Sequence, residues 1–260
     1  MTARTLTRPA TPPAFGALDY PSSDGEPMAE TDQHRDLLFE STTRLAHRHA
    51  ADPNVYVSGN LLVYYQEGDT RLCLAPDCFV AFGVEKGDRE TFKTWVEQAY
   101  PAVVFEFTSK STRDRDTGVK FAIYQDLWKV DEYFLFDPFE EYLTPSLIGY
   151  RRDPRGDLLP IPPDADGGVL STRLNLTVLR DGLSLAFRDA ATGELVLNAY
   201  EDQARIATER NAEAQQAARN ADQVARDAQQ AARADADARR EAEARLADAL
   251  AELARLRKSP

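Results

Sequence analysis

Up to about residue 199, short apolar runs separated by polar turns dominate the chain, and this pattern predicts β-strands. Asp181-Gly182 predicts a tight hairpin turn. Pro76 predicts a local break in its strand, because proline occurs in sheets only at edges or bulges. The predicted strands are residues 55–57, 61–65, 72–84, 102–108, 133–136, 148–151, 168–172, 176–180 and 183–188.

Helical periodicity is found in three segments of the same part of the chain, residues 31–50, 89–99 and 114–128. The first segment begins with Thr31-Asp32, which is a helix N-cap signal. In the second, the residues expected on one side are Phe92, Trp95 and Val96. In the third, the residues expected to face the core are Val119, Ala122, Ile123 and Leu127. Alternating strands and helices flanked by hairpins predict an α/β (α+β) fold with a mixed sheet.

From about residue 200 to residue 258 the chain is rich in alanine and charge and contains neither glycine nor proline. Heptad spacing from Ala207 to Leu256 finds apolar residues at twelve of fifteen positions, with Asn211, Asp235 and Arg239 as the exceptions. One continuous helix here would extend about 85 Å at 1.5 Å per residue. We predict a coiled-coil tail that mediates self-association. The alternative is a solvated single helix, stabilised by alanine propensity and alternating charge.

Composition predicts three parts: a disordered lead over residues 1–30, a folded domain over residues 31–199, and the tail over residues 200–260. We expect a cytoplasmic protein, because the sequence has neither a transmembrane run nor the apolar core of a secretory signal. Cys73 and Cys78 are expected to be reduced thiols, and His47 and His49 have no matching pair for a zinc site.

The formal net charge is −12, which disfavours a protein that coats nucleic acid, because affinity for phosphates comes from lysine and arginine. This charge still permits an enzyme that meets DNA through one local basic patch and a metal ion.

Two carboxylates occupy unusual positions: Asp77 follows Pro76, and Glu106 lies inside the apolar run of residues 103–108. An isolated buried carboxylate is costly unless it is paired or bound to a metal. A divalent cation held jointly by Asp77 and Glu106 on adjacent strands is one solution, and Mg²⁺ or Mn²⁺ prefers such oxygen ligands. Such a cation promotes phosphodiester hydrolysis, with an ammonium group to orient water or stabilise developing charge.

These carboxylates belong to an ordered series of motifs: Pro76-Asp77, Glu106-Phe107-Thr108, Ser109-Lys110-Ser111-Thr112, then Asp116, Lys120 and Tyr124, then Glu132-Tyr133-Phe134-Leu135-Phe136-Asp137-Pro138. Over about residues 31–200 the series resembles the Uma2 family of restriction-endonuclease-like proteins, within the PD-(D/E)XK nuclease superfamily. The resemblance implies a restriction-endonuclease-like sheet, DNA as the substrate and Mg²⁺ (or Mn²⁺) as the cofactor. It also implies that Asp77 and Glu106 are the metal ligands.

The chain departs from the superfamily pattern at the lysine that usually stands two residues after the glutamate, where this sequence has Thr108. Lys120, on the following helix, is the first candidate to replace it, since its long side chain can cross to the strand. This placement is similar to variants within the superfamily. Lys110 is the second candidate. If neither lysine reaches the site, the chain keeps the fold without the chemistry. Tyr124 and Trp128 are expected in the core.

The sequence therefore predicts a Mg²⁺-dependent DNA endonuclease with Asp77, Glu106 and Lys120 as catalytic residues. The alternative is a catalytically inactive scaffold or binding protein of the same fold that acts through its coiled coil. Thr108, the acidic charge and the long tail favour this alternative. A hydrolase of another phosphate ester would share the metal site. Sequence specificity is not predicted, because no helix-turn-helix, zinc finger or basic recognition stripe is visible.

Overall fold

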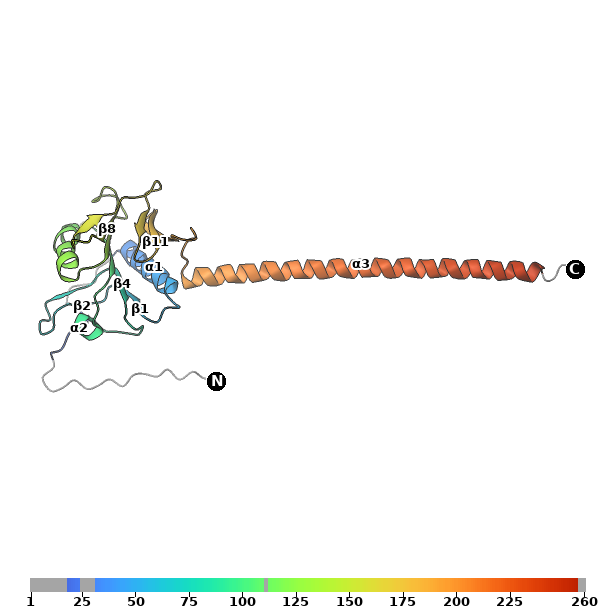
Figure 1. Ribbon diagram of the computed structural model, residues 1–260, viewed down its shortest axis with the longest axis horizontal. Helices are drawn as coiled ribbons and strands as arrows, with labels where there is room; N and C mark the ends of the chain where they lie inside the picture. The colour runs from blue at the N-terminus through green and yellow to red at the C-terminus, as the bar shows by residue number, and fades with distance from the viewer. Residues whose placement is uncertain (1–17, 24–30, 110–111, 257–260) are drawn as a thin grey trace. The chain divides into compact units, whose positions relative to one another are not determined.

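The computed structural model describes residues 18–23, 31–109 and 112–256, so most of the lead expected over residues 1–30 lies outside the described residues. The chain divides into two compact units, Met1–Ala199 and Tyr200–Pro260. Helical elements are α1 Asp32–Arg48, α2 Thr94–Glu97, the π-helices η1 Arg115–Lys120 and η2 Ile123–Leu127, and α3 Ala199–Leu256 (Figure 1). The strands are β1 Val55–Ser58, β2 Val63–Tyr64, β3 Cys73–Leu74, β4 Cys78–Phe82, β5 Phe92–Lys93, β6 Val103–Phe107, β7 Glu132–Phe136, β8 Leu147–Arg152, β9 Leu158–Pro160, β10 Val169–Ser171, β11 Leu176–Asp181 and β12 Ser184–Asp189.

A six-stranded sheet of order β1-β4-β6-β7-β8-β9 forms the centre of the first unit. β6 pairs with β7 in parallel, and the other neighbours pair antiparallel, so the predicted mixed sheet of an α+β fold is confirmed. Every residue of β6 is buried, as its apolar sequence predicts. β11 and β12 form the predicted hairpin at Asp181-Gly182, where glycine adopts a φ of 61° that other residues disfavour.

The two faces of the central sheet are covered by different elements. On one face, Phe105 packs with α1 and with the strands β10–β12. On the other face, Val104 packs with Tyr124 and Trp128. Side chains alternate along a strand, so Glu106 is directed to the same face as Val104, toward the π-helices.

The predicted helix at residues 114–128 is present, but its buried face differs from the prediction. Val119 is 63% exposed and Leu127 is 55% exposed. The buried residues instead follow a spacing of four: Asp116, Lys120, Tyr124 and Trp128. Four residues overrun an α-helical turn of 3.6 by about 40°, so this spacing drifts off one face of an α-helix. The wider turns of η1 and η2 keep these side chains in line.

The predicted helix at residues 89–99 is much shorter in the structure, where only Thr94–Glu97 is α-helical. Phe92 is instead fully buried in β5, which pairs in parallel with β2. Val96, expected on the same side as Phe92, is 64% exposed. Strand pairing to a distant segment therefore outweighs the local helical periodicity.

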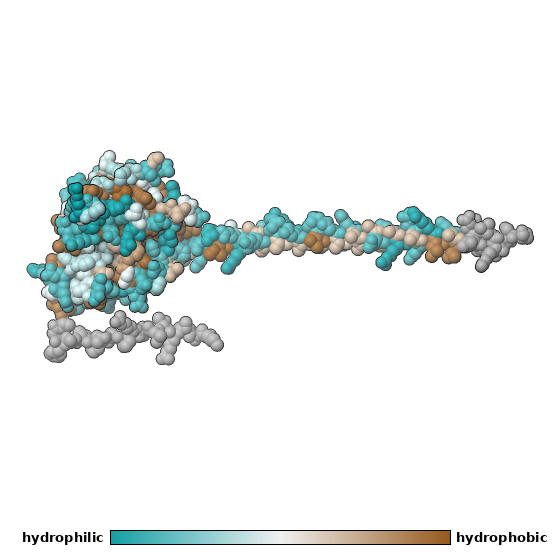
Figure 2. All heavy atoms as spheres, in the orientation of Figure 1, coloured by the Kyte–Doolittle hydropathy of each residue, from teal (hydrophilic) through white to brown (hydrophobic). Residues whose placement is uncertain are grey.

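The second unit is the predicted long helix, α3, which is continuous over 58 residues. Hydrophilic residues cover much of the face seen in Figure 2, with hydrophobic residues at intervals. Several large apolar side chains along it are exposed, namely Val224, Leu246 and Leu250. Self-association through this helix stays a prediction. None of the described helices combines the length and the apolar character needed to cross a membrane.

Candidate active site

Asp77 and Glu106 come together where β4 and β6 meet. Cys78 pairs with Phe105 in the antiparallel register, and one further position along this register places Asp77 opposite Glu106. The backbone N–H of Phe107 donates a hydrogen bond of 2.6 Å to Asp77 Oδ2. This bond ties the segment that follows Pro76 to the central strand.

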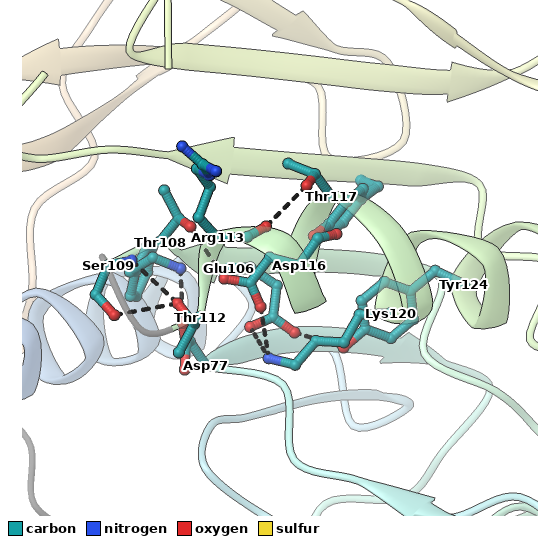
Figure 3. Close-up of polar contacts among 12 residues, drawn as sticks. Asp77, Glu106, Thr108, Ser109, Thr112, Arg113, Asp116, Thr117, Lys120 and Tyr124 are labelled. Carbon is teal, nitrogen blue, oxygen red and sulfur yellow. Dashed lines mark hydrogen bonds and ion pairs between the residues drawn. The ribbon is translucent and has the colours of Figure 1, made fainter. Parts of the chain in front are cut away.

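Glu106 is fully buried, and each of its carboxylate oxygens has a donor from the helix above it (Figure 3). Lys120 Nζ lies 2.7 Å from Oε2, and the Tyr124 hydroxyl donates to Oε1 at 2.5 Å. Lys120 therefore reaches the strand from η1, while Lys110 lies outside the described residues. Tyr124 is a core residue, as the sequence predicts, and its hydroxyl also orients Glu106.

Asp116 is a third buried carboxylate at this position, which sequence analysis noted in a motif without giving it a role. It is 1% exposed, and its Oδ1 lies 3.0 Å from Lys120 Nζ. Its Oδ2 accepts a hydrogen bond of 3.1 Å from the hydroxyl of Thr108. Thr108 thus holds the acid that pairs with Lys120. The spacing of four between Asp116 and Lys120 was the available signal.

His34, in the first turn of α1, is a further residue beside this cluster. Its Nε2 lies 3.3 Å from Asp77 Oδ1, and its ring meets the ring of Phe107 at a centroid distance of 6.1 Å. No pattern in the sequence pointed to His34, because it lies in a polar helical turn far from both carboxylate motifs.

Burial and mutual repulsion set the protonation of the cluster. Burial raises the pKa of Glu106 to about 8; the charges of Asp77 and Asp116 act in the same direction and Lys120 opposes them. Burial alone would lower the pKa of Lys120, but Glu106, Asp77 and Asp116 outweigh it and raise the pKa above its ordinary value. Lys120 therefore keeps its proton, and Glu106 is the group that titrates.

The pKa of Asp77 is shifted in the opposite direction from that of Glu106. Burial acts to raise it, but the hydrogen bond from His34, the charge of Lys120 and the N–H of Phe107 together lower it. Ionised Asp77 therefore lies next to a Glu106 that is protonated below pH 8. Because carboxylate ligands bind a metal in their deprotonated form, a divalent cation held here would favour release of the Glu106 proton.

The donor set fits a hard divalent cation better than zinc. Within residues 18–23, 31–109 and 112–256, no group of three or more histidine, cysteine, aspartate or glutamate side chains is arranged to hold a metal ion. Glu106 and Asp116 both contact the Lys120 ammonium. Mg²⁺ is commonly held by one or two carboxylates, with water and substrate phosphate completing its coordination. Asp77 and Glu106 offer two carboxylates of this kind.

The fold and this site define a mixed-sheet α+β protein with a buried cluster of carboxylates and one lysine. A family model for Uma2, described as "Putative restriction endonuclease", matches residues 17–186, which is more than half of the chain. The chain belongs to the Uma2 family, and the resemblance seen in its sequence motifs is confirmed.

Comparison with curated proteins gives no match. Among solved structures, the chain is similar to a crystal structure described as a "putative nuclease" from Anabaena variabilis ATCC 29413. The two chains are 14% identical, with a TM-score of 0.42, over 57% of this chain and 76% of the other.

Proposed function

We propose that this protein is a Mg²⁺- or Mn²⁺-dependent DNA endonuclease, with Asp77 and Glu106 as metal ligands and Lys120 as the catalytic ammonium. The observation that carries the proposal is the distance of 2.7 Å between Lys120 Nζ and Glu106 Oε2. Lys120 supplies from η1 the positive charge that Thr108, directly after β6, does not supply. Membership of a family described as "Putative restriction endonuclease" supports DNA as the substrate.

A divalent cation, when bound, supplies Lewis-acid stabilisation of the phosphoryl group and activates water for attack. Asp77 and Glu106 provide the oxygen ligands, and the Tyr124 hydroxyl fixes the orientation of Glu106. The ammonium of Lys120 stabilises the negative charge that develops on the phosphate, since it acts in a site with little water. Asp116 keeps that ammonium charged and in position.

The test is cleavage of supercoiled plasmid DNA by the full-length protein with Mg²⁺ or Mn²⁺. Asp77→Asn and Glu106→Gln keep the size of each side chain and are expected to abolish cleavage while the circular dichroism spectrum is unchanged. Asp114→Asn is the matched control, because this carboxylate lies nearby with an 87% exposed side chain, and it is expected to cleave like wild type. Equal cleavage by all four proteins would remove Asp77 and Glu106 from the site.

We also propose that α3 mediates self-association. Exposed Val224, Leu246 and Leu250 on a continuous helix support this proposal, because apolar side chains along a helix favour a partner. Two active sites related by symmetry would suit the cutting of both strands of a duplex.

The scaffold alternative keeps two arguments, the acidic net charge of −12 and the long helix α3. The close contact of Lys120 with Glu106 counts against it. A defined oligomer that cleaves no nucleic acid with any divalent cation would favour the scaffold over the nuclease.

A further inference from the structure

Both oxygens of the Asp77 carboxylate have a partner, and the two partners come from different elements. Oδ2 accepts from the backbone N–H of Phe107 at 2.6 Å, and Oδ1 lies 3.3 Å from Nε2 of His34. The backbone contact fixes only one end of the carboxylate. Rotation about the bond that carries the carboxylate is therefore restricted by His34.

His34 reaches Asp77 from the α1 side of the sheet, opposite the π-helices that hold Lys120. The Thr31 side chain caps α1 by accepting a hydrogen bond from His34 N at 3.2 Å. The imidazole then packs edge-on against the Phe107 ring, with an interplanar angle of 71°. A capped backbone and an aromatic neighbour hold the imidazole at the end of β6, directed toward Asp77.

The pair also lies nearer to solvent than the rest of the cluster. The side chains of His34 and Asp77 are 18% and 15% exposed, whereas those of Glu106 and Asp116 are 0% and 1% exposed. An incoming cation or phosphate therefore meets Asp77 before the deeper carboxylates. The orientation of Asp77 matters most at this entrance.

We propose that His34 is a positioning residue of the active site: it donates Nε2–H to Asp77 Oδ1 and orients this carboxylate toward the cation shared with Glu106. The part of this inference that concerns the cation rests on the proposed function. The contact itself rests on the geometry of His34 and Asp77. Groups that hydrogen-bond to a metal-ligating side chain affect metal affinity through orientation, and losing one weakens binding about 10- to 100-fold.

The test is calorimetric titration of Mn²⁺ into the full-length protein. His34→Ala is expected to weaken Mn²⁺ binding about 10- to 100-fold. His34→Gln is expected to bind almost as wild type does, because glutamine carries an N–H donor the same number of bonds from Cα. His47→Ala, which removes an imidazole from the last turn of the same helix, is the control and is expected to bind like wild type.

The dependence of the cleavage rate on Mn²⁺ concentration distinguishes a positioning role of His34 from a general structural role. His34→Ala is expected to need more Mn²⁺ for half-maximal cleavage and to approach the wild-type rate at saturating Mn²⁺. Wild-type Mn²⁺ affinity in His34→Ala would overturn the inference and leave the proposed function intact. A reduced rate that excess Mn²⁺ does not restore would also overturn it.

A measurement without metal tests the contact between His34 and Asp77 separately from metal binding. It can be made even if wild type binds no Mn²⁺, an outcome that would refute the proposed function. Melting temperatures of His34→Ala, Asp77→Asn and the double variant are compared in EDTA. Shifts that are smaller in the double variant than the sum of the single shifts support the contact. Additive shifts overturn it.

Discussion

Lys120 and Glu106 form a buried, hydrogen-bonded pair between η1 and β6, with 2.7 Å between Nζ and Oε2. Glu106 is fully buried and Lys120 is 7% exposed, so both groups have lost most of their water. Apolar residues of similar volume stabilise a fold as well as or better than such a pair. The pair therefore favours a chemical role over a purely structural one.

Replacing Lys120 separates its role in stability from its role in catalysis. Lys120→Met keeps the length of the side chain but leaves Glu106 and Asp116 without their cation. We expect a loss of about 3–5 kcal/mol in the free energy of unfolding in EDTA, measured with urea. Mn²⁺ is expected to bind this variant and recover part of the stability, since it replaces the missing positive charge, while DNA cleavage stays absent.

The control for this variant is Arg115→Met, which removes an exposed positive charge from the same helix. Its free energy of unfolding is expected to change by less than about 0.5 kcal/mol. Wild-type cleavage by Lys120→Met would show that the ammonium does not take part in the reaction.

The raised pKa of Glu106 predicts how the free energy of unfolding depends on pH. Burial raises this pKa to about 8 from an ordinary 4.5, so the native state holds a proton that the unfolded chain has released. Stability due to this group is therefore greatest at low pH and is lost as pH rises toward 8. Glu106→Gln cannot titrate. Between pH 6 and 8 in EDTA, we expect wild type to lose about 2 kcal/mol of unfolding free energy relative to this variant.

Urea unfolding at several pH values measures the difference, and the variant corrects for every other titrating group. Parallel pH profiles for the two proteins would mean that Glu106 is ionised throughout this range. In that case the Lys120 charge would dominate over burial.

Local patterns predicted the parts of the fold that depend on neighbouring residues. The strand that carries Glu106 and the hairpin at Asp181-Gly182 were both found from apolar runs and turn residues. The failures depend on features that apolar runs and turn residues do not report. Phe92 joins a strand because β2 lies beside it, and Val119 is exposed because the π-helices break the period of 3.6.

For the candidate site as well, the sequence pointed to some residues and not to others. Asp77, Glu106 and Lys120 came from the order of the motifs, which places acids on adjacent strands and a lysine on the next helix. His34 was missed because α1 reaches the site only through the tertiary packing of its first turn against Phe107. Single polar residues of this kind carry no periodic signal.

Gly59 is expected to be intolerant of a side chain. A Cβ at this position would lie 2.3 Å from the backbone oxygen of Asp77 and 2.9 Å from Thr42 Oγ1. Gly59→Ala must therefore displace the segment that carries Asp77, and we expect a loss of about 1–3 kcal/mol with weaker Mn²⁺ binding. Thermal unfolding and calorimetry measure the two effects.

Gly118→Ala is the control for this substitution, because nothing lies within 4 Å of the added Cβ. It is expected to be neutral or to stabilise the helix by up to about 1 kcal/mol. Equal melting temperatures for the two alanine variants would contradict the close contact at Gly59.

The two cysteines, Cys73 and Cys78, are expected to differ in reactivity. Cys78 is fully buried, and burial raises the pKa of its thiol to about 12, so very little of the reactive thiolate forms. Cys73 is only partly buried. A chromogenic disulfide reagent should modify one thiol per native chain quickly and the second only after unfolding. Cys73→Ser should lose the fast phase, and a fast phase that persists in this variant would place Cys78 within reach of solvent.

Self-association through α3 makes a prediction for the full-length protein in solution. Leu246 lies on the heptad seam and is 62% exposed in the single chain, so an aspartate there would place a charge in a coiled-coil interface. Sedimentation is expected to show an oligomer for wild type and a shift toward monomer for Leu246→Asp. Ala247→Asp adds the same charge beside the seam and should stay oligomeric. A monomeric wild type would leave α3 as a solvated single helix.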